Sequence, residues 1–240
     1  NNINLNLGVP GSSPLFEYIA LKEYVEPLVV PKNIVWIYYE GNDLSELENT
    51  LELYKDTYLA KYLTDKNFTQ NLSINNAKKD KYLSEFFKKR INLHKKNDEM
   101  RDAQKITNKY TYLNFITLTK IRTSFNRYNP QNIDPNTMEM FYKILEKTKK
   151  MSENLNSKLY FVYLPSIERY NHNFLDRWYF NDKRSNSHFS YNEILKIVKK
   201  LNIPLIDIKT NVFSNHKDPL SLFPSRLHHH YNEEGYKEVG

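Results

Sequence analysis

The chain has 240 residues, of which 40% are apolar, and 35 lysine and arginine residues against 28 acidic ones give a formal net charge of +7. This length fits one sizeable α/β domain, and no stretch approaches the roughly 18 consecutive apolar residues of a membrane-spanning helix. The absence of cysteine excludes disulfides and thiol catalysis.

The positive charge alone would raise nucleic acid as a partner. However, the basic residues fall mostly on predicted helices between acidic neighbours, as in residues 78–101, where a solvated helix face explains them. We therefore expect no nucleic-acid partner, and no membrane contact by these residues. Neither expectation places the protein in a compartment.

The first predicted element is a short strand. Residues 3–9 alternate apolar and polar side chains and then reach a tight loop containing Gly8, Pro10 and Gly11. Pro14, behind two serines, opens a helix predicted over residues 14–28. The expected buried face of this helix contains Leu15, Ile19, Val25 and Leu28.

The central predicted strand is the β-branched and aromatic run at residues 34–39. It stops at the polar loop Glu40-Gly41-Asn42-Asp43, and a helix is predicted over residues 44–63. In open α/β sheets ligands bind outside the carboxyl ends of the strands. The polar loop is therefore where we expect chemistry.

Residues 64–135 form a long polar, helical segment without strand signals. We interpret this segment as a helical insertion packed over the carboxyl edge of the sheet. It serves either as a lid or specificity element, or as a purely structural excursion.

The rest of the chain continues the alternation of strands and helices. The predicted elements are a helix at 137–155, strands at 158–164 and 203–208, a helix at 190–201 and a final helix after His230. This alternation predicts a single α/β domain, with a mostly parallel sheet and helices on both faces. An irregular aromatic stretch is expected at 169–189. The strand tyrosines Tyr160 and Tyr163 are interpreted as core, and the aromatic cluster at 169–180 either as structural or as a wall on which a sugar stacks.

Three polar loops carry motifs in this order: NLGVPGSSP around Gly11, YYEGNDL around Asn42, and HYNEEGY beginning at His230. Together they resemble the SGNH/GDSL hydrolases. The resemblance implies a three-layer α/β/α flavodoxin-like fold. It also implies that Gly11 lends a backbone N–H and Asn42 a side-chain amide to an oxyanion hole, and that His230 is the catalytic base.

The chain departs from this pattern in two places. The Gly-Asp-Ser block with the nucleophile has no counterpart, so we expect the block and its strand to precede Asn1, in a chain cut at both ends. Ser12 and Ser13 are alternative nucleophiles by proximity only. The acidic residue usual before the base is replaced by Leu227. A backbone carbonyl or Asp218 is expected to orient the imidazole instead.

The run His228-His229-His230 invites a metal interpretation. Adjacent side chains diverge, and no second ligand pair stands at a familiar spacing, so no metal and no cofactor is predicted. The other histidines, His94, His172, His188 and His216, are interpreted as surface or structural residues.

The function expected from the resemblance is hydrolysis or transfer of an acyl group, with a small-molecule or carbohydrate ester as substrate. The family context suggests the cell envelope or periplasm. The alternative is a non-catalytic carbohydrate-binding or scaffold module on the same fold, favoured by the missing carboxylate at Leu227. A nucleic-acid-binding protein is a third hypothesis, supported by charge alone.

Overall fold

The structure is a computed structural model that describes residues 4–54, 57–73, 133–170 and 190–240. The chain divides into two compact units, residues 1–69 with 130–240 and residues 70–129. The predicted insertion at 64–135 contains the second unit, of which only residues 70–73 are described. Most of the insertion, and nearly all of the aromatic stretch at 169–189, therefore lie outside the described residues.

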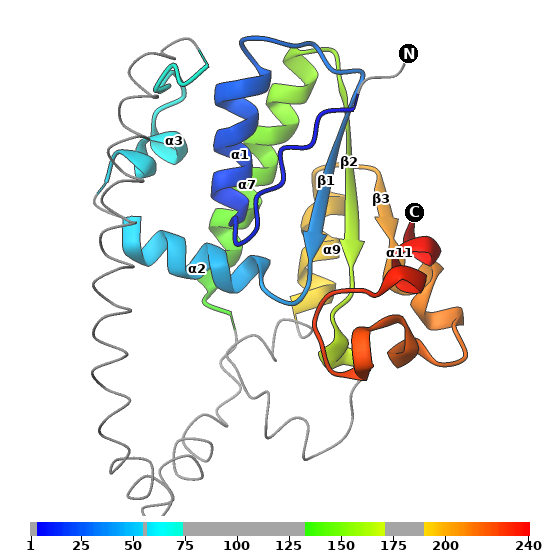
Figure 1. Cartoon of the computed structure of the whole chain (residues 1–240). Helices are drawn as coiled ribbons and strands as arrows, with labels where there is room; N and C mark the ends of the chain where they lie inside the picture. The colour runs from blue at the N-terminus through cyan, green and yellow to red at the C-terminus, as the bar shows by residue number, and fades with distance from the viewer. Residues whose placement is uncertain (1–3, 55–56, 74–132, 171–189) are drawn as a thin grey trace, which may run out of the picture. The chain divides into compact units, whose positions relative to one another are not determined.

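The first unit contains a three-stranded parallel sheet (Figure 1). Its strands are β1 (Asn33–Tyr39), β2 (Lys158–Leu164) and β3 (Leu205–Asp207), in the order β1-β2-β3. Ile37 pairs with Val162, which pairs in turn with Ile206. Helices connect successive strands, as parallel pairing requires. This confirms the predicted mixed α/β class and the parallel sheet.

The helices alternate with the strands. The α-helices are α1 (Pro14–Ala20), α2 (Asp43–Tyr54), α3 (Lys61–Thr64), α7 (Pro135–Asn154), α9 (Tyr191–Lys200), α10 (Ile208–Asn211) and α11 (Glu233–Val239). A π-helical turn, η1 (Leu21–Val25), continues α1. The short 3-10 turns are η2 (Tyr58–Ala60), η3 (Ile167–Arg169), η5 (Phe213–Asn215), η6 (Pro219–Leu222) and η7 (Pro224–Arg226).

Local sequence explains where these helices begin. Asp134 caps α7 by accepting a hydrogen bond from the N–H of Asn136 at 3.1 Å, and Pro135 occupies the first turn. Asn232 caps α11 in the same way, through the N–H of Gly235 at 2.8 Å. The predicted helices at 137–155, at 190–201 and after His230 are confirmed as α7, α9 and α11.

The main core lies between the inner face of the sheet and helices α1, α7 and α9. The fully buried ring of Tyr38 packs 5.6 Å from Phe141 and 5.8 Å from Phe161, between ring centroids. A smaller aromatic cluster surrounds Phe213, Phe223 and Tyr231. This second cluster fixes the segment that precedes α11.

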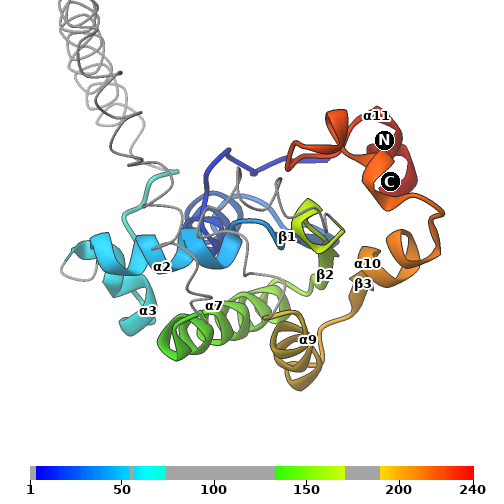
Figure 2. The ribbon, with the colours of Figure 1, turned by 90° about the horizontal axis from the view of Figure 1, so that it is seen from below.

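The two faces of the sheet are covered differently. Figure 2 shows α7 and α9 on one face and α11 on the other. Val35 and Ile37 of β1, on the second face, remain 55% and 54% exposed. Within the part of the chain that the structure describes, β1 pairs only with β2, so the other edge of β1 is open.

Several predicted boundaries are wrong. Residues 4–9 have no regular secondary structure, because no neighbouring strand supplies them with a ladder. Leu28 is 61% exposed, since the first helix ends at Val25, ahead of Pro27. The helix after β1 ends at Tyr54 instead of residue 63. β3 begins at Leu205 rather than residue 203, because Pro204 has no N–H for the ladder.

Candidate functional site

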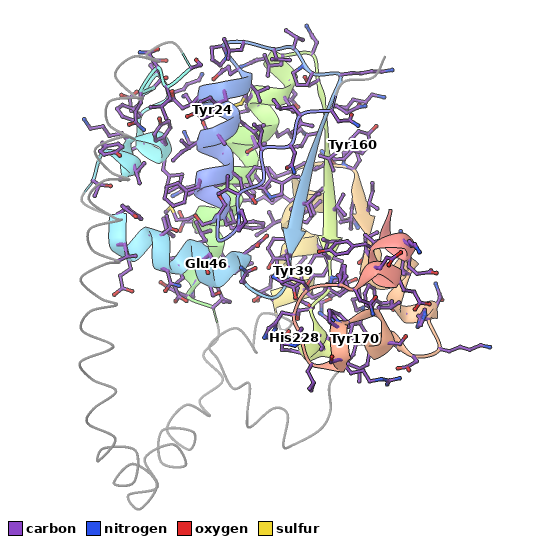
Figure 3. All side chains as sticks on the ribbon, viewed as in Figure 1. Tyr24, Tyr39, Glu46, Tyr160, Tyr170 and His228 are labelled. Carbon is purple, nitrogen blue, oxygen red and sulfur yellow. The ribbon has the colours of Figure 1, made fainter. Side chains whose placement is uncertain are left out.

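The polar loops meet where the strands end. The start of α1, the end of β1 and the loop before α11 all lie at the carboxyl end of β1 (Figure 1). Figure 3 shows Tyr39, the last residue of β1, beside the loop that carries His228. The geometry thus brings together the three segments in which site residues were predicted.

The loop after β1 rests on a buried carboxylate. Glu40 is 0% exposed, and its oxygens accept hydrogen bonds from the Tyr163 hydroxyl and, at 2.9 Å, from the Ser166 N–H. The guanidinium of Arg169 binds the same carboxylate, with Nε at 3.1 Å from Oε2. A buried charge needs a cation and further hydrogen bonds to be tolerated, and Glu40 has both. Glu40 therefore locks the end of β1 to the turn after β2.

Asn42 sits at the tip of this loop. Its backbone carbonyl accepts hydrogen bonds from Ser45 Oγ at 2.8 Å and from the Glu46 N–H at 2.7 Å, so its main chain is fixed. Its side chain is half-buried, and among the described residues no group hydrogen-bonds to its amide. The amide is therefore held in place yet free to donate to a ligand.

Gly11 lies in an exposed turn closed by a hydrogen bond from the Ser12 N–H to the Val9 carbonyl at 3.0 Å. Its φ of +72° is a conformation that glycine adopts without strain. Within the described part of the chain its own N–H makes no hydrogen bond. Both predicted donors, the Gly11 N–H and the Asn42 amide, are thus uncommitted.

The loop of three histidines is held by side chains from the strand ends. The Tyr39 hydroxyl donates a hydrogen bond to the His229 carbonyl. The Nδ1 atom of His229 lies 2.7 Å from Glu168 Oε1. The ring of His230 stacks on that of Tyr39, with centroids 6.0 Å apart, while His228 is exposed. Burial, with Glu168 and other nearby charges, raises the pKa of Tyr39. Its hydroxyl therefore stays protonated and can donate this hydrogen bond.

Neither predicted orienting group contacts the His230 ring. Asp218 instead pairs with Arg226, with Nη1 at 3.2 Å from Oδ1. Within the described ranges no group hydrogen-bonds to the imidazole of His230. The histidine loop does contact the carboxylate of Glu168, on η3, but the partner of Glu168 is His229.

Two acidic residues, Glu17 on α1 and Asp43 at the start of α2, have raised pKa values. Burial, together with the charge of Asp43, raises the pKa of Glu17 to about 9. Burial also raises the pKa of Asp43 to about 7, against the hydrogen bond from the Tyr39 N–H. Ser13 Oγ and Glu17 Oε2 are buried, and the described residues offer them no hydrogen-bond partner. Glu17 is therefore protonated at neutral pH.

The alternative nucleophiles have no base beside them. Ser13 is 1% exposed and its carbonyl starts α1, and no hydrogen bond in the described chain joins Ser12 or Ser13 to a histidine. The described part of the chain contains no cluster of three or more His, Cys, Asp or Glu side chains able to hold a metal ion.

The sequence predicted Glu40 only as part of the polar loop after the central strand, and it did not point to Glu168 or Glu17. Two of them carried a usable signal, because Glu40 directly follows β1 and Glu168 closely follows β2. Acidic residues at the carboxyl ends of parallel strands are candidates on topology alone. Glu17 sits within a helix and carried no comparable signal.

Comparison of the chain with protein-family models, with curated proteins and with solved structures gives no match. No helix in the described ranges is long and apolar enough to cross a membrane. What the fold and the site define is a mixed α/β protein with a polar site at the carboxyl end of a parallel sheet.

Proposed function

We propose that the chain is the main part of an ester-acting enzyme of the SGNH/GDSL type, with a flavodoxin-like sheet. The observation that carries the proposal is the uncommitted amide of Asn42, whose backbone is fixed in the loop after β1, together with a loop of histidines that Tyr39, at the end of the same strand, holds in place. An ester-cleaving site needs the same two components, a preorganised donor and a nearby base.

Each residue then has a defined role. The Asn42 amide and the Gly11 N–H stabilise the oxyanion of the tetrahedral intermediate. His230, in the loop that stacks on Tyr39, takes the proton of a serine hydroxyl and returns it to the leaving alcohol. Transfer of the acyl group to a carbohydrate hydroxyl instead of water uses the same groups. We propose a small-molecule or carbohydrate ester as the substrate.

Residues 1–240 contain no motif that matches the nucleophile of such an enzyme. We propose that a strand preceding Asn1 carries the serine and pairs with β1. The open edge of β1 among the described residues supports this placement. In the flavodoxin-like order such a strand lies beside β1 with its carboxyl end at the same site.

A fluorophosphonate probe, which reacts with activated serines, tests the proposal. We expect the full-length protein to be labelled at a serine before Asn1 and to hydrolyse an aryl acetate, and residues 1–240 alone to do neither. Labelling of residues 1–240 at Ser12 or Ser13 would overturn the nucleophile assignment. Absence of both labelling and hydrolysis in the full-length protein would overturn the enzyme.

A non-catalytic carbohydrate-binding module is the second candidate. The observation that favours it is the exposed His230 ring, to which no described group hydrogen-bonds. This candidate predicts saturable binding of an acetylated oligosaccharide with no release of acetate. Isothermal titration combined with an acetate assay separates it from the enzyme.

A further inference from the structure

Residues from the ends of two strands bind the histidine loop at one residue, His229. The side chain of His229 binds Glu168, with Nδ1 to Oε1 at 2.7 Å, and its backbone carbonyl accepts the Tyr39 hydroxyl. Glu168 follows β2 on η3, and Tyr39 ends β1. Both the main chain and the side chain of His229 are thereby fixed to the sheet.

The carboxylate that binds His229 is partly desolvated and charged. The Glu168 side chain is 15% exposed and that of His229 is 29% exposed. Burial acts to raise the pKa of Glu168, but the hydrogen bonds from His229 and Ser166 outweigh it and hold that pKa below its ordinary value. An ionised acceptor makes the shorter and stronger kind of hydrogen bond.

The segment that carries Glu168 is itself rigid. The Ser166 N–H donates to Glu40 Oε2 at 2.9 Å, and Arg169 binds the same buried carboxylate. Glu168 lies between these two anchors. A side chain mounted on such a braced turn can set the position of whatever it binds.

The residue after His230 is anchored as well. Tyr231 is 5% exposed, and its hydroxyl donates to the Pro165 carbonyl at 2.6 Å. His230 is thus enclosed by two fixed neighbours. Its ring needs no hydrogen bond of its own to remain stacked on Tyr39.

We infer that Glu168 is the positioning residue for the base. By holding His229 it fixes the backbone of His230, a task that Leu227, which has no carboxylate, cannot perform. The inference rests on the proposed function for the role of His230. The contact between Glu168 and His229 is independent of that function. It places the orienting acid on the turn after β2 rather than in the histidine loop.

Kinetics of the full-length protein on an aryl acetate test the positioning role. We expect Glu168→Gln and His229→Gln each to lower kcat about 10- to 100-fold with KM nearly unchanged, because misplacement of a catalytic group by about 1 Å costs up to about 100-fold. The double variant should lose no more kcat than either single variant, since both substitutions remove the same contact between Glu168 and His229. Glu234→Gln, on the exposed start of α11, is the matched control and should behave as the wild type. Wild-type kcat in Glu168→Gln, or losses that multiply in the double variant, would overturn the inference.

A measurement that needs no turnover separates the two proposals. ¹³C NMR of the Glu168 carboxyl follows its titration in the wild type, His229→Gln and His228→Gln. Loss of the His229 hydrogen bond should raise the pKa of Glu168, whereas substitution of the exposed His228 should leave it unchanged. If the pKa of Glu168 shifts in His229→Gln but the protein cleaves no ester, the contact between Glu168 and His229 is confirmed and the proposed enzymatic function is wrong. If His229→Gln leaves the pKa unchanged, the inference fails whatever the activity.

Discussion

The backbone N–H of Tyr39 donates a hydrogen bond to Asp43 Oδ2 at 2.8 Å, tying the last residue of β1 to the first residue of α2. This bond closes the loop that presents Asn42. Asp43→Ala leaves the Tyr39 N–H without its acceptor, and we expect the free energy of unfolding to fall by about 1 to 3 kcal/mol in urea titrations. Asp43→Asn keeps an acceptor oxygen and should lose less. Equal losses in the two variants would contradict the role of this bond.

The raised pKa of Glu17 predicts a pH dependence of stability. Its pKa is about 9 in the folded protein and about 4.3 in an unfolded chain. Between these values the unfolded chain releases a proton that the folded protein keeps, so the free energy of unfolding should fall as the pH rises from about 5 to about 9. Asp43 acts in the same direction up to about pH 7.

Glu17→Gln isolates this contribution. Relative to the wild type, the variant should gain stability steadily between pH 5 and pH 9, in chemical denaturation at each pH. Glu52→Gln, at an exposed position of α2, is the control and should follow the wild-type curve. A constant difference between Glu17→Gln and the wild type across this range would show that the Glu17 carboxyl titrates normally.

Gly41 is required by the ring of Tyr39. A Cβ atom at this position would lie 2.3 Å from Tyr39 Cε1, and the ring is anchored through its hydroxyl on the His229 carbonyl. Gly41→Ala should therefore displace the ring, shift the NMR signals of the stacked His230 imidazole and lower kcat on an aryl acetate by up to about 100-fold. Gly8→Ala, in the exposed N-terminal segment, should change neither. Unshifted His230 signals in Gly41→Ala would contradict the linkage.

Much of the fold follows from local sequence. β1 and β2 are runs of aliphatic and aromatic residues, and α7 combines a cap with helical apolar spacing, so their positions could be predicted. Residues 4–9 could not, because an alternating pattern forms a strand only where a neighbouring strand accepts it.

The site was less accessible to prediction. The position of Asn42 at the site could be predicted, because Asn42 follows β1 and ligands bind outside the carboxyl ends of such strands. The contact between Glu168 and His229 joins two loops far apart in the sequence, whereas the motif predicts an orienting acid only close to His230, at position 227 or at Asp218. Such pairings depend on how η3 and the histidine loop pack, which local patterns do not encode.

The most direct test of the proposed ester chemistry is the effect of Asn42→Ala on kcat in the full-length protein with an aryl acetate as substrate. The account predicts a fall of about 10²- to 10³-fold with KM little changed, because an oxyanion donor acts on the transition state. Asn49→Ala, an exposed asparagine on α2, should retain wild-type kinetics. An unchanged kcat in Asn42→Ala, in an enzyme that otherwise cleaves the ester, would contradict the role of Asn42 in the oxyanion hole.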